Sequence, residues 1–267
     1  MLSEAYLVIR RLRINGQFKD AYASLSAVPP TSDDDAFEAA MCLYQAGDIA
    51  SAINVCQTVR WRDQWARDIA GALARFAQGG GANKALPLAR QAVVSGSAPP
   101  DAQAFYLFLL RALDTPGAMD EARALIAKRL QQVPASEAGL LAEMMEIAIG
   151  LGDPDTAYRH ACAIQSLYPR HLGSLYALCL INERIGNHHE ALGIAMRVRL
   201  LDPKSQRATL FIMRCQNQLG DHYAALGAFD KLGIEKPAET ELLTQCAVAF
   251  AGVGQARKAI ELLKQAV

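Results

Sequence analysis

The sequence predicts an all-α solenoid built from repeated pairs of antiparallel helices. A glycine followed five residues later by an alanine recurs eight times along the 267-residue chain, and successive alanines lie 31 to 37 residues apart, settling at 34 in the C-terminal half. A fixed period of this length is typical of repeat solenoids. The composition, 52% hydrophobic but only 7% aromatic, suits closely packed helices better than a β-rich core. The pairs are Gly16/Ala21, Gly47/Ala52, Gly80/Ala85, Gly117/Ala122, Gly152/Ala157, Gly186/Ala191, Gly220/Ala225 and Gly254/Ala259.

One repeat, residues 171–203, shows how each element is predicted. Apolar residues recur at helical spacing from Leu172 and end at Gly186, which can adopt a left-handed C-terminal cap because it has no Cβ atom. Asn187 can cap the helix that follows, where Ala191 allows the two helices to approach closely. Pro203 ends the second helix. Equivalent capping residues are Asp48, Asp153, Asp221 and, after Pro203, Ser205; equivalent prolines are Pro134, Pro169 and Pro237.

This spacing of glycine, alanine and proline predicts eight helical hairpins over the whole chain. The first helices are expected near 2–14, 35–46, 65–78, 101–114, 137–151, 171–185, 205–219 and 239–253, and the second helices near 18–27, 49–60, 82–95, 119–132, 154–168, 188–201, 222–233 and 256–266. We expect one continuous solenoid over 1–267. A division into two sub-arrays near 96–101 is the alternative, because a Pro-rich linker interrupts the pattern there.

The pattern resembles the tetratricopeptide repeat (TPR) family, and the resemblance covers essentially the whole chain. It rests on the Gly–Ala–Pro spacing and on the small or apolar trio of the first helices, such as Leu175, Leu178 and Cys179. The large aromatic residue usual in the family's first helix is mostly replaced, so the repeats are degenerate. The resemblance implies a right-handed TPR superhelix, an α-solenoid of antiparallel helix pairs.

The resemblance also implies a binding groove. In the family the first helices line a concave face, and the matching stripe here has an aromatic and Met-containing N-terminal section and an Arg-rich C-terminal section. Such a stripe would hold an extended or helical peptide, with apolar anchors in the first section and carboxylates on Arg in the second. Charge reversal of Arg207 and Arg214 is then expected to weaken binding without loss of helix. The predicted partner-binding residues are Tyr6, Arg10, Phe37, Met41, Tyr44, Leu107, Arg111, Glu146, Tyr176, Glu183, Arg207, Leu210, Arg214 and Asn217.

Sequence motifs that would indicate a catalytic, phosphate-binding or metal site are weak. The run Gly79-Gly80-Gly81 lacks the spacing of a phosphate-binding loop and reads as an interhelical turn. His188, His189, Glu190 and His222 lie in neighbouring turns, but such turns are usually solvent-exposed and polar, so we predict no metal site. Without a catalytic signature we predict neither an enzyme nor a cofactor. The six cysteines have no CxxC pair and are expected as free thiols.

Charge excludes other classes of partner. Lys and Arg together number 27, as do Asp and Glu, so no long-range field favours nucleic acid. No apolar run is long enough to span a bilayer, and the N-terminal stretch lacks the order of a signal peptide, so we expect a cytoplasmic protein without membrane insertion.

These observations favour a non-catalytic scaffold or adaptor that binds a protein or peptide segment. The resemblance places such proteins in bacterial assembly or secretion. A regulatory or substrate-docking region of a larger enzyme, such as a glycosyltransferase or sulfotransferase, is one alternative. The other is a self-assembling solenoid, with homo-oligomer contacts through the uncapped C-terminal repeat, where Ile260, Leu262 and Leu263 precede Ala266-Val267.

Overall fold

The computed structural model describes residues 2–94, 96, 98–131, 133–233 and 240–266. Those residues form sixteen α-helices and contain no strand. The chain divides into two compact units, Met1–His171 and Leu172–Val267. The position near 96–101 where a division was the alternative belongs to the first unit, in which the helices Gly81–Val94 and Pro100–Leu113 pack on each other.

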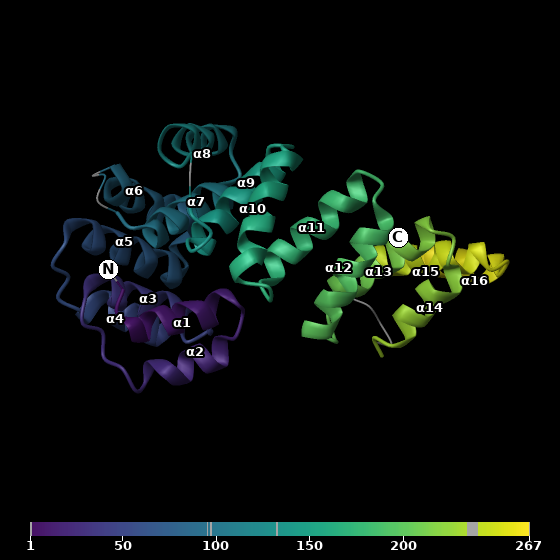
Figure 1. Cartoon of the computed structure of the whole chain (residues 1–267), viewed down its shortest axis with the longest axis horizontal. Helices are drawn as coiled ribbons and strands as arrows, with labels where there is room; N and C mark the ends of the chain where they lie inside the picture. Colours follow the sequence, from purple (N-terminus) through teal and green to yellow (C-terminus); the bar gives the residue numbers. More distant parts are fainter. Residues whose placement is uncertain (1, 95, 97, 132, 234–239, 267) are drawn as a thin grey trace. The chain divides into compact units, whose positions relative to one another are not determined.

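The first unit contains five helical hairpins (Figure 1). Successive helices pack on one another, and the first helices α7 and α9 also pack directly on each other, with α8 in contact with both. The helices are α1 (Glu4–Ile14), α2 (Phe18–Leu25), α3 (Asp33–Gln45), α4 (Ile49–Thr58), α5 (Gln64–Arg75), α6 (Gly81–Val94), α7 (Pro100–Leu113), α8 (Pro116–Arg129), α9 (Ala138–Gly150) and α10 (Pro154–Leu167), with a π-type turn at Phe76–Gly80 between α5 and α6.

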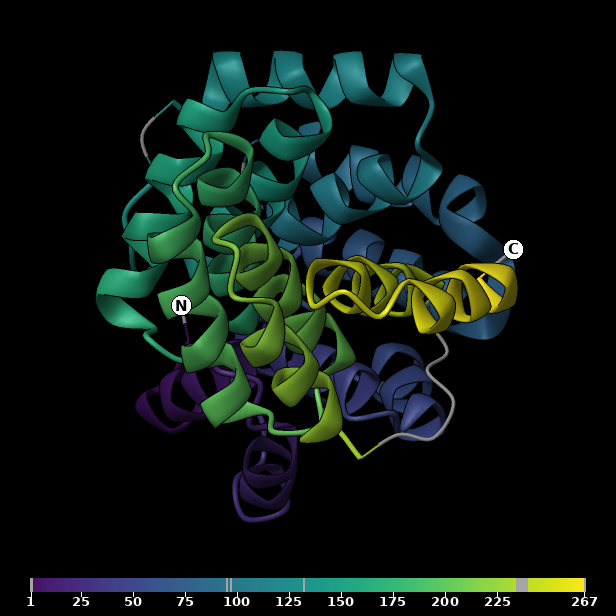
Figure 2. The same ribbon diagram turned by 90° about the vertical axis from the view of Figure 1, so that its right-hand side faces the viewer.

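The second unit contains three hairpins (Figure 2). They are α11 (Leu172–Arg184) with α12 (His188–Leu201), α13 (Gln206–Gln218) with α14 (His222–Asp230), and α15 (Thr240–Gly252) with α16 (Ala256–Gln265). The predicted helix pairs are confirmed with shifts of a few residues at their ends; the predicted ends at 95, 132 and 239, and Pro237, lie outside the described residues.

The predicted glycine cap, at which the first helix of a repeat ends before the second begins, is confirmed in most repeats. Gly186 has φ +78° and its N–H donates to the Glu183 carbonyl, while the Asn187 N–H donates to the Asn182 carbonyl. This pair of bonds is the Schellman motif, in which a left-handed residue satisfies the last carbonyls of a helix. The same pair closes the helices that end before Gly16, Gly47, Gly152, Gly220 and Gly254.

The third and fourth repeats correct the predicted pattern. Gly79, one residue before the predicted Gly80, has the positive φ of +78° that ends α5. In the fourth repeat Asp114 takes the left-handed conformation at φ +47°, and Gly117 lies in the first turn of α8. Thr115 caps α8 by accepting from the Ala118 N–H, so the helix begins before Gly117 and needs no glycine there.

Most of the predicted caps are confirmed. The side chains of Asp48, Asp153, Asp221 and Ser205 each accept a hydrogen bond from the backbone N–H three residues on. Asn187 is the exception, because its amide donates to the Asn182 side chain instead of capping α12.

The predicted close packing at the alanines is also confirmed. Seven of the eight repeat alanines are completely buried and Ala259 is 5% exposed. In α2 and α16 the repeat alanine is the one buried residue among those described. The second helices therefore contact the rest of the fold through a narrow strip, and the first helices carry most of the core.

Candidate functional site

The first-helix face of the second unit carries a ladder of polar and aromatic contacts between successive repeats. Arg214 on α13 forms a bidentate ion pair with Glu183 on α11, with N–O distances of 2.5 and 2.6 Å. Its third nitrogen, Nη1, lies 3.1 Å from Glu241 Oε1 on α15, and its guanidinium stacks over Phe211 at 5.3 Å from the ring centroid. A planar guanidinium with two parallel bonds to a carboxylate is a strong, directional pair.

Arg207 has a different environment on the same face. Its guanidinium lies 4.4 Å from the centroid of the Tyr176 ring, within the range of a cation–π contact. The Tyr176 hydroxyl forms a 2.6 Å hydrogen bond with Ser205 Oγ, which holds the ring in place. Arg207 is exposed and forms no ion pair within the described part of the chain. It therefore presents an oriented cation to solvent.

The end of this ladder is an amide contact. Asn217 donates from Nδ2 to both the backbone carbonyl of Gln245 (3.0 Å) and its side-chain oxygen (3.1 Å). The Asn217 oxygen lies 3.2 Å from Nδ1 of His222. Asn217 is only 9% exposed, so these contacts join α13, α14 and α15 more than they offer a free amide.

The first unit uses its first-helix arginines internally. Arg13 is buried and makes a bidentate ion pair with Glu38 at 2.5 and 2.8 Å, and its Nη1 donates to Gln45 at 3.1 Å. Burial by itself lowers the pKa of Arg13, but the Glu38 carboxylate outweighs it and raises that pKa above its ordinary value. Burial raises the pKa of Glu38, against the lowering caused by Arg13.

Arg10 links α1 to distant parts of the same unit. Its Nη2 lies 2.6 Å from Glu137, the residue just before α9, and 3.2 Å from Asp101 in the first turn of α7. Asp101 also lies 3.8 Å from Arg13. The network connects residues 127 positions apart and neutralises both arginines within the unit. We call Arg10, Arg13, Glu38, Asp101 and Glu137 the buried charge network.

Aromatic side chains fill the adjoining part of the first unit. Tyr44 lies 6.0 Å from Phe76 between ring centroids, and Phe76 lies 5.4 Å from Phe108 in an edge-to-face contact. The Arg111 guanidinium lies over Phe108 at 5.7 Å and pairs with Glu143 at 3.1 Å. Met41 packs against the same core. These residues connect the second, third, fourth and fifth repeats.

The predicted partner-binding residues therefore differ in accessibility. Tyr6, Arg10, Phe37, Leu107, Leu210 and Asn217 are buried or nearly so. Tyr6 donates to the Val28 carbonyl at 3.1 Å, and burial raises the pKa of Tyr6 to about 12. Partly exposed residues are Met41, Tyr44, Arg111, Glu146, Tyr176, Glu183 and Arg214, and Arg207 is exposed. The structure brings Tyr176, Glu183, Arg207 and Arg214 together, and separately joins Arg10 to the buried charge network.

Sequence reasoning did not foresee that these arginines pair with acidic residues of the chain itself. Arg111 and Glu143 are 32 residues apart, and Arg214 and Glu183 are 31 apart, which is about one repeat. Exposed Arg90 and Glu121 also pair at a separation of 31. Opposite charges one repeat apart on equivalent helices could have predicted these pairs from the sequence. The link from Arg10 to Glu137 had no such signal, because it depends on how five repeats curve.

The other features singled out from sequence hold no built chemical site among the described residues. Gly79 and Gly81 have positive φ and form the turn into α6. No group of three or more His, Cys, Asp or Glu in the described ranges could hold a metal ion. The six cysteines are free, and five of them are buried. None of the described helices is both long and apolar enough to cross a membrane.

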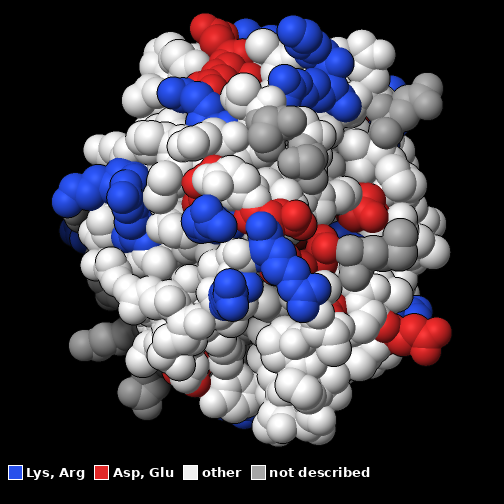
Figure 3. Space-filling model, turned by 90° about the vertical axis from the view of Figure 1, so that its left-hand side faces the viewer, with Lys and Arg blue, Asp and Glu red and all other residues white. Residues whose placement is uncertain are grey.

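Charge on the surface is mixed. The face of the first unit in Figure 3 shows Lys and Arg side chains in several patches, with Asp and Glu side chains between them. A continuous basic surface, the usual footprint of nucleic-acid binding, is not seen on that face. On α16, Ile260 and Leu263 are about half exposed, and self-association through them stays a prediction.

The fold is similar to several solved helical-repeat structures. A chain of the APC/C hetero-tetramer Cut9–Hcn1 aligns with a TM-score of 0.70 and 14% identity over 98% of this protein, which spans only 55% of that chain. A tetratricopeptide repeat protein from Parabacteroides merdae aligns with a TM-score of 0.55 and 14% identity, covering 89% of this chain and 93% of that one. The protein has the TPR fold.

The human IFIT1 dimer with m7Gppp-AAAA shares this TPR fold, with a TM-score of 0.56 and 13% identity over 96% of this chain and 76% of that one. No protein-family model and no curated protein matches the sequence. The predicted all-α TPR solenoid is thus confirmed by structure. At these identities the similarity concerns the fold alone.

Proposed function

We propose that this protein is a non-catalytic scaffold that binds an acidic protein segment on the first-helix face of its second unit. The observation that carries the proposal is Arg207, an exposed guanidinium oriented by Tyr176 and without an ion-pair partner among the described residues. The other arginines predicted to bind a partner, Arg10, Arg111 and Arg214, are all paired with acids of the chain itself, as is Arg13 on α1. A carboxylate arriving at Arg207 would not need to displace an internal partner.

The surroundings of Arg207 suit an extended segment. Tyr176 and Phe211 lie 6.2 Å apart between centroids and give an aromatic surface beside the cation. Glu183 and Arg214 continue along the same face as a paired, partly exposed rung. A segment with one carboxylate at Arg207 and apolar or uncharged groups beyond it would meet no unpaired like charge there.

The structure changes the choice of test. Reversing Arg214, the mutation suggested by sequence together with Arg207, would place a third carboxylate beside Glu183 and Glu241 and destabilise the unit itself. Arg207→Glu alone avoids this, because Arg207 is exposed. Arg184→Glu, on α11 and also exposed, is the matched control with the same change in charge.

The experiment is an array of 15-residue peptides probed with the intact chain, followed by fluorescence anisotropy on the best binders. We expect acidic peptides to be enriched and Arg207→Glu to weaken them about tenfold or more, as for the loss of a charged hydrogen bond. Arg184→Glu should stay within about twofold, and circular dichroism should show unchanged helix in both variants. Binders without acidic residues, or equal weakening by the two variants, would refute the proposal.

The bacterial assembly or secretion role is supported only by resemblance, and we propose it as the setting in which such a scaffold acts. The enzyme-linked alternative differs in one measurable way. A docking region would bind peptides that are also substrates of the attached enzyme. The peptides selected above would identify that case directly.

A further inference from the structure

The packing between successive repeats contains a recurring contact near the helix turns. His222, the first residue of α14, lies against Gly252 at the end of α15. Met119, in the first turn of α8, lies against Gly150 at the end of α9, where an added Cβ would be 3.4 Å from the Met119 methyl group. In both cases the glycine stands two residues before the repeat glycine, and its missing side chain leaves room for the neighbour.

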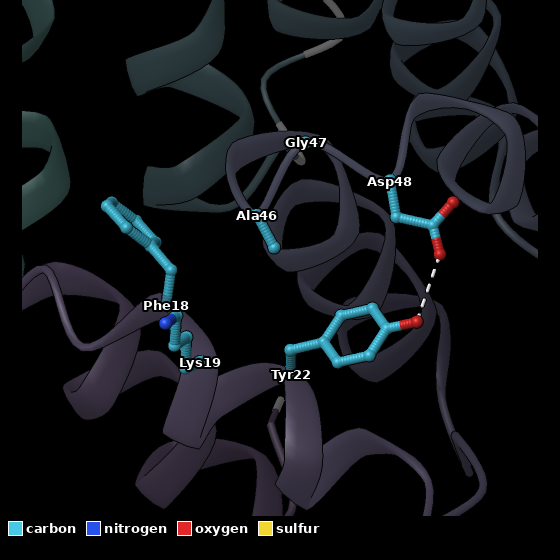
Figure 4. A pocket seen from close by; sticks show the side chains of 6 residues that line it. All are labelled: Phe18, Lys19, Tyr22, Ala46, Gly47 and Asp48. Carbon is cyan, nitrogen blue, oxygen red and sulfur yellow. Dashed lines mark hydrogen bonds between the residues drawn. The ribbon is translucent and has the colours of Figure 1, made fainter.

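The first repeat lacks this fit. Phe18, the first residue of α2, is the equivalent of His222, but the position two residues before Gly47 is Gln45 instead of glycine. Phe18 is left 37% exposed, and an open pocket of about 490 Å³ lies between α2 and the turn that joins α3 to α4. Six residues line this aromatic pocket: Phe18, Lys19, Tyr22, Ala46, Gly47 and Asp48 (Figure 4).

The Tyr22 side of the aromatic pocket is held in place by hydrogen bonds. The Tyr22 hydroxyl donates to Asp48 Oδ2 at 3.1 Å, and Asp48 Oδ1 accepts from the Ser51 N–H at the start of α4. Figure 4 shows the rings of Phe18 and Tyr22 on either side of Ala46, with Tyr22 directed toward Asp48. Ala46 and Gly47 contribute almost no side-chain bulk between the rings. An entering group would therefore contact two aromatic rings, of which Tyr22 is already held by its hydrogen bond to Asp48.

The charges at the rim have opposite signs and lie at different ends of the aromatic pocket (Figure 4). Asp48 accepts hydrogen bonds from Tyr22 and Ser51, which are neutral donors and leave its negative charge in place at the Tyr22 end. Lys19 stands on the Phe18 side, is exposed and forms no ion pair within the part of the chain that the structure describes. A carboxylate on the entering group therefore complements the Phe18 side of the pocket.

We propose that the aromatic pocket is a second docking site, which takes a protein segment carrying a bulky apolar side chain next to an acidic residue. The apolar side chain lies between Phe18 and Tyr22, and the carboxylate pairs with Lys19. This site belongs to the first unit and is independent of the Arg207 face, so the two proposals fail separately.

The test is a selection of 12-residue peptides displayed on phage, using the intact chain. The library is first depleted on the Phe18→Ala/Tyr22→Ala variant, so that peptides bound elsewhere are removed. We expect the survivors to share an apolar residue beside Asp or Glu. Binding of synthetic survivors, measured by anisotropy, should weaken at least fivefold in Phe18→Ala and in Lys19→Glu.

Matched controls separate pocket binding from general exposure. Tyr158→Ala removes a tyrosine that is equally exposed, at 44%, and occupies the position of Tyr22 in the fifth repeat, yet does not line the aromatic pocket. It should leave the selected peptides unaffected, as should Arg207→Glu. Failure to recover any peptide after depletion, or equal weakening by Tyr158→Ala, would overturn the proposal. Dimerisation in sedimentation experiments that is lost in Phe18→Ala would overturn it in favour of a second copy.

Discussion

Replacing Arg13 with Met should expose how much the first unit depends on its buried charge network. Arg13 and Glu38 are 8% and 1% exposed at their side chains, and they share two hydrogen bonds. Removing the guanidinium leaves the Glu38 carboxylate buried without its main partner. Breaking a buried pair in this way typically costs about 3 to 5 kcal/mol.

The structure allows a narrower range for the loss in free energy of unfolding. A stranded Glu38 can escape its unpaired charge by taking up a proton. For a carboxyl with an ordinary pKa of about 4.3 this costs about 3.7 kcal/mol at pH 7, at 1.36 kcal/mol per pH unit. We therefore expect Arg13→Met to lower the free energy of unfolding by roughly 3 to 4 kcal/mol at pH 7.

The pH dependence follows from the same argument. In the variant the pKa of folded Glu38 lies far above its unfolded value, so the folded state binds a proton that the unfolded state has released. Stability then falls as pH rises above about 4.3. The loss relative to wild type should shrink to about 1 kcal/mol at pH 5, where protonation costs little.

The assay is urea unfolding followed by circular dichroism at pH 5 and pH 7. Arg13→Met/Glu38→Leu removes both charges and should recover most of the loss, with no pH dependence from this pair. Arg123→Met breaks an exposed pair with Asp120, whose side chains are 58% and 68% exposed, and should cost about 0.5 kcal/mol or less. A loss below about 1 kcal/mol for Arg13→Met at pH 7, or one that is equal at both pH values, would refute the reasoning.

Two further predictions concern backbone and titration. Gly186→Ala should destabilise the second unit by about 1 to 2 kcal/mol, because φ at this residue is +78°. Gly193→Ala should stabilise the same unit by about 0.5 to 1 kcal/mol, because Gly193 lies inside α12 with open space around an added Cβ. Thermal unfolding of both variants tests these opposite signs. Burial lowers the pKa of His171 to about 4, so its contribution to stability is complete above about pH 6.5 and is lost toward pH 4. His171→Asn should flatten the stability profile in that window, and an unchanged profile would exclude His171 as its source.

Internal pairing explains why most of the arginines predicted to bind a partner are not available to a ligand. Arg10 and Arg13 join parts of the first unit, and Arg111 and Arg214 join neighbouring repeats. Family resemblance places such residues at a ligand. Here the structure assigns them to the fold, and among the arginines predicted to bind a partner Arg207 is left without an ion pair in the described part of the chain.

Much of the fold could be read from local sequence. Gly186 predicted a helix end because a left-handed cap depends only on the backbone of a few residues. Asp221 predicted a cap for the same reason, and its bond to the Ala224 N–H is present. Gly117 misled the prediction, because spacing does not reveal that Asp114 takes over the left-handed turn.

The candidate sites were less predictable. Arg207 and Tyr176, which the sequence pattern placed on one stripe, are in contact, and this was foreseeable because their helices repeat with a regular period. Sequence pattern could not show that Arg214 is already paired, because that depends on the reach and rotamer of two side chains. The aromatic pocket was also hidden, since it arises from a mismatch between Phe18 and the end of α3.

Sequence by itself determined the helices, their turns and the buried alanines, because these depend on contacts within a few residues or one repeat. Tertiary structure alone decided which of the charged side chains predicted to be exposed have an ion-pair partner within the chain. Arg10 reaches Glu137 across 127 positions only because the repeats curve, and the small shifts in each repeat add up over that distance. Local propensities set each repeat, and their accumulated geometry determines which charges meet.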